Sequence, residues 1–157
     1  MLSIQSTKIM INYSQPDLTQ HPPRSVRVRL GGYAHLSRLL DKARAHLAGK
    51  AGEFHYNCPL DQRFFTFTGI NHEAMLAEIK SGKSDVEILA WVNERAKRQP
   101  QEIATWSAWL EQLAPGGSEG HEWIASVIKG HKSARDDIRS FAELLDFDDY
   151  LCYGGKA

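Results

Sequence analysis

Short helical patterns, each bounded by its own start and stop signals, follow one another along most of this chain. Ser84 and Glu87 form a capping box, and Asn71 is a good N-cap because its side chain accepts hydrogen bonds from first-turn amides. Proline suits a first turn, since it lacks an amide proton that would be unpaired there. These signals predict a helix after Gly31-Gly32 ending at Gly49, helices over 60–67, 71–82, 84–98 and 100–113, and two more capped by Ser118 and Ser133.

Apolar residues recur at helical spacing within these segments, which favours packed amphipathic helices. The chain has 157 residues, 42% of them hydrophobic, which is enough for one sizeable core. We therefore predict a mainly α fold: a compact single-domain bundle of about seven short helices. Residues 1–15 are expected to form a mobile leader and residues 16–157 the domain, with an extended arm over residues 16–32.

The arm carries signals against a helix. Pro16 and Pro22-Pro23 interrupt any helical hydrogen-bond pattern. Beyond them, Val26, Val28 and Leu30 alternate with arginines. This alternation predicts an extended segment with its apolar side inward and its arginines outward.

The helix after the arm carries a basic stripe offset from its leucines. The stripe consists of His35, Arg38, Lys42 and His46. The whole chain has 19 Lys+Arg and 19 Asp+Glu, so this clustered charge needs a partner. The partner is either an external anion or the C-terminal carboxylates of Asp146, Asp148 and Asp149.

The sharper hypothesis is an anion pocket where the arm meets this helix. Gly31 and Gly32 would let backbone N–H groups approach an anion, and the helix dipole favours negative charge there. The alternative is that the glycines only make a turn and the charges form a solvated face, since no phosphate-loop motif is present. The predicted ligand-binding residues are Arg24, Arg27, Gly31, Gly32, Arg38, Lys42 and Arg63.

The region from His55 to Arg63 is the best candidate for chemistry. Cys58 precedes a helix start, where amide donors and the helix dipole favour a thiolate, and His55 is close in sequence. The catalytic candidates are Cys58, His55 and Asp61, with Arg63 in the same pocket. The alternative is that Cys58 is a small buried hydrophobe and that Asp61 and Arg63 belong to a structural polar network.

Neither metal nor cofactor binding is predicted. The seven histidines lack the spacing that places two ligands on one helix turn, and the C-terminal aspartates lack the spacing of a calcium loop. Cys58 and Cys152 are too few for a disulfide framework and are expected to be free thiols. Four tryptophans are interpreted as core packing, with Trp109, at the margin of an apolar face, also a candidate for ligand stacking.

The overall charge and the hydropathy exclude some partners. A neutral net charge argues against a duplex nucleic-acid binder. The sequence contains neither a signal-peptide pattern nor an apolar run near membrane-spanning length. We therefore expect a cytoplasmic protein with no membrane partner, and the oligomeric state stays open.

Several short motifs in combination resemble a known family. They include Leu30-Gly31-Gly32-Tyr33, Tyr56-Asn57-Cys58-Pro59-Leu60-Asp61, Phe67-Thr68-Gly69-Ile70, the segment from Ser84 to Trp91, and Asp146 to Tyr150 with Gly154-Gly155. From Asp17 onward the chain resembles a bacterial domain-of-unknown-function family, number five thousand and sixty-nine. The resemblance implies a soluble, mainly helical bacterial domain, and it supplies no activity, ligand or catalytic residue.

Two functions of different classes follow. The leading prediction is a non-catalytic or accessory domain that binds an anionic small molecule or an acidic protein partner at the junction of arm and first helix. The alternative is a small cytoplasmic enzyme whose pocket is built from Cys58, Asp61, Arg63 and His55.

Overall fold

The computed structural model describes residues 10–157; the first nine residues of the expected leader lie outside the described residues. Within residues 10–157 there are seven helices and no strand, which confirms the predicted mainly α fold. The helices are α1 (Leu36–Leu47), α2 (Pro59–Thr68), α3 (His72–Lys80), α4 (Asp85–Ala96), α5 (Pro100–Gln112), α6 (Ser118–Gly130) and α7 (Phe141–Cys152). None of them is long and apolar enough to cross a bilayer, a finding that covers the described part of the chain.

The predicted start signals are confirmed for the middle helices. The Asn71 side chain accepts hydrogen bonds from the first-turn amides of α3, and Ser84 forms its capping box with Glu87 at the start of α4. Both α2 and α5 begin at a proline. These local interactions satisfy amides that a helix leaves unpaired, so they fix where each helix begins.

The last two helix starts differ from the prediction. Ser118 is the first residue of α6, whose N-cap is Gly117. Ser133 begins no helix, and α7 starts after Ser140. The reason is a better capping box: Ser140 Oγ accepts the Glu143 amide at 3.1 Å, and Glu143 Oε2 accepts the Ser140 amide at 2.9 Å.

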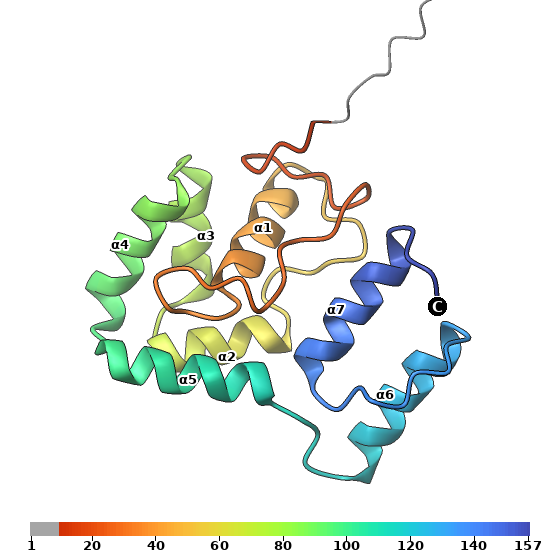
Figure 1. Cartoon of the computed structure of the whole chain (residues 1–157). Coiled ribbons are helices and arrows are strands. Elements are labelled where there is room, and N and C mark those ends of the chain that lie inside the picture. The colour runs from red at the N-terminus through yellow and green to blue at the C-terminus, as the bar shows by residue number, and fades with distance from the viewer. Residues whose placement is uncertain (1–9) are drawn as a thin grey trace, which may run out of the picture.

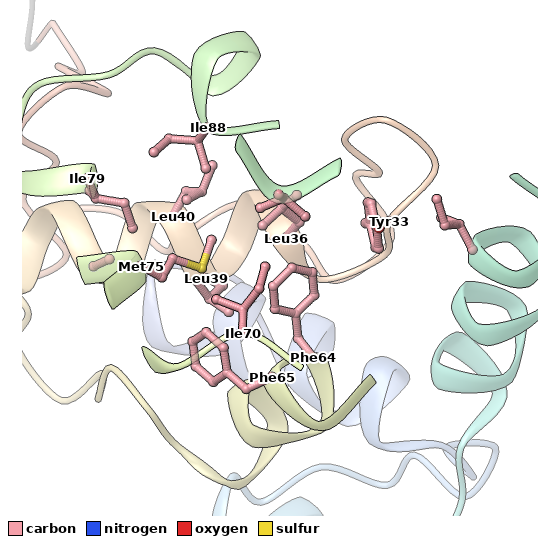
Figure 2. Packing of buried hydrophobic residues seen from close by; sticks show 13 residues of the cluster. Tyr33, Leu36, Leu39, Leu40, Phe64, Phe65, Ile70, Met75, Ile79 and Ile88 are labelled. Atoms are coloured by element: carbon pink, nitrogen blue, oxygen red, sulfur yellow. The ribbon is translucent and has the colours of Figure 1, made fainter. Parts of the chain in front are cut away.

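The main core lies between the first four helices. Figure 2 shows side chains of α1, α2 and α3 gathered around Leu39 and Phe64, with Met75 contributed by α3. Tyr33 packs edge-on against Phe64 with ring centroids 5.6 Å apart. Leu47, expected on the buried face of α1, is 38% exposed because it lies in the last turn, beyond this core.

A second apolar cluster joins α6 to α7. Its buried members are Ile124, Ile128, Ile138, Leu144 and Phe147. Figure 1 shows α6 and α7 on one side of α1 and the pair α3 and α4 on the other. Because α5 contacts α7, the two clusters form one continuous body in which α7 lies close to the N-terminal arm.

The arm is a series of turns rather than an extended segment. Val26 is buried, but Val28 is 44% exposed because the Val28 amide donates to the Ser25 carbonyl and closes a turn that breaks the alternation. Arg27 and Arg29 are exposed, as the alternation predicts, whereas Arg24 before them is half-buried. Gly31 and Gly32, with φ of 57° and 86°, form the centre of a tight turn bridged by Leu30 and Tyr33.

Candidate functional site

The predicted basic stripe on α1 is mostly buried. Arg38 is 2% exposed and donates to both carboxylate oxygens of Asp149, at 2.7 and 3.3 Å. Lys42 is 4% exposed, and only His46 of the stripe lies at the surface. A buried guanidinium needs such a bidentate partner, so this face of α1 packs inside the molecule.

The arginines of the arm also have carboxylate partners. Arg24 donates to Asp41 at 2.9 and 3.0 Å and to Asp85 at 2.8 Å. Arg27 donates to Asp146 at 3.1 Å. Two of the three C-terminal aspartates that the sequence proposed as partners, Asp146 and Asp149, therefore neutralise cations of the arm and stripe.

The glycine pair lies outside the first turn of α1. This helix starts at Leu36, after a left-handed His35, so the amides of Gly31 and Gly32 are not its N-terminal amides. The turn is instead held against α5, where Ser107 Oγ donates to the Gly32 carbonyl at 2.7 Å. These contacts give the predicted anion pocket no support at this position, and binding of an anion there stays a prediction.

The structure brings Lys42 to Cys58. Lys42 Nζ lies 2.7 Å from Asp61 Oδ1, 3.1 Å from the His55 carbonyl oxygen and 3.1 Å from Cys58 Sγ. An ammonium group has three N–H donors, and here each has one acceptor. The sulfur is therefore a hydrogen-bond acceptor for the ammonium, which is the arrangement that stabilises a thiolate.

The start of α2 adds to this environment. Cys58 is the N-cap residue, and the capping box places the Asp61 amide toward the Cys58 side chain. In return, the Cys58 amide donates to Asp61 Oδ2 at 3.3 Å. The positive end of the helix dipole thus lies at the same sulfur as the Lys42 ammonium.

Asp61 positions the Lys42 ammonium, and His35 in turn hydrogen-bonds to Asp61. Asp61 is fully buried, and its Oδ1 also accepts from His35 Nε2 at 2.6 Å. Burial alone would raise the pKa of Asp61, but the hydrogen bond from His35 and the charge of Lys42 outweigh it and hold the pKa below its usual value. Burial lowers the pKa of His35 in spite of Asp61, which favours a neutral imidazole, and with Nδ1 unpartnered the tautomer that fits is the one whose Nε2–H donates to Asp61.

The other two residues of the predicted pocket have different places. The His55 side chain is exposed, and His55 enters the cluster through its backbone carbonyl. Arg63 is exposed on α2, with its guanidinium 5.6 Å from the ring centroid of Trp109. Within residues 10–157, no carboxylate forms an ion pair with Arg63, unlike the arginines of the arm.

A cavity of about 280 Å³ lies beside Cys58 between α2, α6 and α7. Its lining residues are Cys58, Pro59, Leu60, Arg63, Trp123, Phe141, Leu144 and Leu145. Trp123, expected in the core, is 51% exposed and belongs to this wall. The site therefore combines a thiol, an apolar cavity and, at Arg63, a cation with no carboxylate partner in the described chain.

Sequence reasoning found Cys58, Asp61 and Arg63 but missed the partners that matter most to the thiol. Helical periodicity places Lys42 and His35 on a charged stripe, but the sequence does not show which face of α1 meets α2. One local signal was present: Cys58-Pro59-Leu60-Asp61 matches a capping box with cysteine in the place usually taken by serine or threonine.

The fold and site define an all-helical domain with a buried ionic cluster beside a free cysteine. Residues 20–151 match the family model for a domain of unknown function, DUF5069, and the chain belongs to this family. This confirms the resemblance inferred from the motifs. A comparison with curated proteins finds no match.

Proposed function

We propose that this protein is a cysteine-dependent acyl-transfer enzyme with Cys58 as its nucleophile. The observation that carries the proposal is the Lys42 ammonium, which donates to Cys58 Sγ over 3.1 Å at the edge of an apolar cavity. The thiolate attacks the carbonyl carbon of an ester or thioester, the S–C bond to Cys58 forms as the C–O or C–S bond to the leaving group breaks, and the leaving group takes a proton from water. Water or an alcohol then attacks the thioester carbonyl, takes the acyl group and releases the Cys58 thiolate. Lys42 stabilises the thiolate, and Asp61 positions Lys42.

The cavity and Arg63 indicate the substrate class. An apolar cavity of about 150 Å³ holds a benzene molecule, so about 280 Å³ accommodates an acyl group with one ring or a short branched chain. Arg63 lines this cavity, and its guanidinium, which stacks on Trp109 and has no carboxylate partner in the described chain, has N–H donors for a carboxylate or phosphate. The anionic ligand predicted from the sequence is thus kept in this proposal, at Arg63 rather than at the arm.

We place this chemistry in the bacterial cytoplasm, as the sequence predicts. Cys58 and Cys152 are both free thiols, and a nucleophilic cysteine requires a compartment that keeps it reduced. Binding of an acidic protein partner at the arm stays a prediction without support from the paired arginines.

The test is covalent capture of an acyl group. The full chain is incubated with S-phenyl thiobenzoate, and the protein is followed by intact mass while thiophenol release is measured. We expect one benzoyl group on Cys58, no adduct in Cys58→Ser, and an unchanged adduct in Cys152→Ser. An adduct that persists in Cys58→Ser, or none in the wild type, contradicts the proposal.

Arg63 is tested with a matched substrate that adds one carboxylate, the S-phenyl monothioester of terephthalic acid. Arg63→Met is expected to slow acylation by this substrate about tenfold, the factor for one charge-assisted hydrogen bond of about 1.4 kcal/mol. The rate with thiobenzoate should be nearly unchanged. Equal losses with both substrates would mean that Arg63 shapes the cavity rather than binding an anion.

A further inference from the structure

Three metal-ligating side chains meet where α6 and α7 end. His131 is the C-cap residue of α6, and its Nε2 lies 2.6 Å from Asp148 Oδ1. Cys152 Sγ lies 3.8 Å from the same oxygen. The donor atoms of all three residues lie within 4.8 Å of one another. This cluster is separate from the Cys58 site and uses none of its residues.

The backbone explains why the three side chains converge. Asp148 and Cys152 are four residues apart on α7, so they lie one above the other on the same helix face. His131 reaches them from the end of α6. Its ring packs edge-on against Phe147 of α7 at a centroid distance of 5.9 Å. The imidazole is thus oriented by an apolar neighbour with Nε2 toward Asp148.

Asp148 differs from its two acidic neighbours in having no lysine or arginine partner among residues 10–157. Asp146 pairs with Arg27 and Asp149 with Arg38, whereas the polar partners of the Asp148 carboxylate in the described part of the chain are His131 and Cys152. The Asp148 carboxylate is therefore not neutralised by a cationic side chain of the described chain, which leaves negative charge at this point that favours a bound cation.

The donor set selects the kind of cation. Nitrogen, sulfur and oxygen donors together suit Zn²⁺, whereas Mg²⁺ and Ca²⁺ prefer oxygen ligands only. Zinc bonds of about 2.0–2.3 Å in a tetrahedron place neighbouring donors roughly 3.3–3.8 Å apart. The sulfur-to-carboxylate distance of 3.8 Å already fits, and the hydrogen bond between His131 and Asp148 has to open by less than about 1 Å.

We infer that His131, Asp148 and Cys152 form a Zn²⁺ site with three protein ligands and one open position. Binding releases the Cys152 thiol proton and replaces the hydrogen bond between His131 and Asp148 with metal bonds. The ion joins the C-terminal ends of α6 and α7. These two helices also supply Trp123 and Leu144 to the cavity beside Cys58.

Cobalt serves as the spectroscopic probe. The full chain is freed of metal with a chelator and titrated with Co²⁺, and the sulfur-to-cobalt charge-transfer band in the near ultraviolet is measured. We expect one equivalent of Co²⁺ to give this band and an equivalent of Zn²⁺ to remove it. The band should be lost in Cys152→Ser and retained in Cys58→Ser, which identifies the ligating sulfur.

The carboxylate and imidazole ligands are tested by thermal unfolding. Zn²⁺ is expected to raise the Tm of the wild type and of Cys58→Ser by several degrees, because it binds the folded state. Asp148→Asn and His131→Gln should lose this rise while keeping the wild-type helical circular dichroism. A wild type without the cobalt band, or a band that persists in Cys152→Ser, overturns the inference.

Discussion

The two cysteines of this protein lie at opposite kinds of helix end. Cys58 is the N-cap of α2, where the Lys42 ammonium donates to its sulfur over 3.1 Å. Cys152 ends α7, where its sulfur lies 3.8 Å from an Asp148 carboxylate oxygen, and burial together with that charge raises the pKa of the Cys152 thiol. The positive end of a helix dipole favours a thiolate and the negative end disfavours it.

The difference teaches that exposure is a poor guide to the chemistry of these thiols. Cys152 is the more exposed cysteine, yet its surroundings disfavour an anion and favour a bound cation. Cys58 is partly buried, yet two donor groups face its sulfur. We therefore propose Cys58 as the nucleophile and Cys152 as the metal ligand.

The largest expected effect comes from removing the carboxylate behind Cys58. Asp61→Asn leaves the Lys42 ammonium buried without a counter-charge, and we expect a loss of about 3–5 kcal/mol in the free energy of unfolding, measured by urea denaturation. The matched change beside Cys152, Asp148→Asn, removes a half-exposed carboxylate and should cost less than about 1 kcal/mol without metal. Equal losses in the free energy of unfolding for the two variants would contradict the expected difference between the surroundings of Cys58 and of Cys152.

A second effect concerns pH and His35. The pKa of His35 is lowered by burial, so the unfolded chain takes up a proton at a pH where the folded chain does not. Stability is then fully present above the unfolded pKa of about 6.5 and falls on acidification, by at most about 1.4 kcal/mol per pH unit for this one group. His35→Gln should lack this part of the decrease between pH of about 7 and 5. If His35→Gln left the pH profile unchanged, the pKa of His35 would be the same in the folded and the unfolded chain, which contradicts the lowering by burial.

A third effect tests the ammonium directly. Lys42→Gln removes the charge at the Cys58 sulfur while keeping a hydrogen-bonding side chain, and alkylation of Cys58 by iodoacetamide is expected to slow about tenfold. Circular dichroism verifies that the variant is folded. Cys152 in the same molecule is the control and should keep its rate. Alkylation of Cys58 at the wild-type rate would show that Lys42 has only a structural role.

Much of the fold was predictable because helix starts are local. Asn71, Ser84 and the two prolines at the starts of α2 and α5 act on amides within one turn, so a sequence pattern suffices to find them. The Ser133 prediction failed because Ser140 offers a complete capping box and Ser133 caps only the nearby Arg135 amide. Two candidate N-cap serines can therefore be ranked only when the residue three positions later is considered together with each serine.

The site was harder to predict because its contacts are not local. Lys42 and Cys58 are sixteen residues apart, and Arg38 and Asp149 are separated by 111 positions. A helical wheel placed Lys42 and Arg38 correctly on one face of α1, but it carries no information about what covers that face. Tertiary packing decided that these cations are buried among carboxylates instead of facing an external anion.

The most direct test of the central claim is a competition between the two thiols in one native molecule. The protein is treated with a small amount of iodoacetamide, and the labelled fractions of the Cys58 and Cys152 peptides are compared by mass spectrometry. We predict that Cys58 reacts about tenfold faster in the folded protein and that the two rates become similar in denaturant. A folded protein in which Cys152 reacts as fast as Cys58, or faster, would contradict the account.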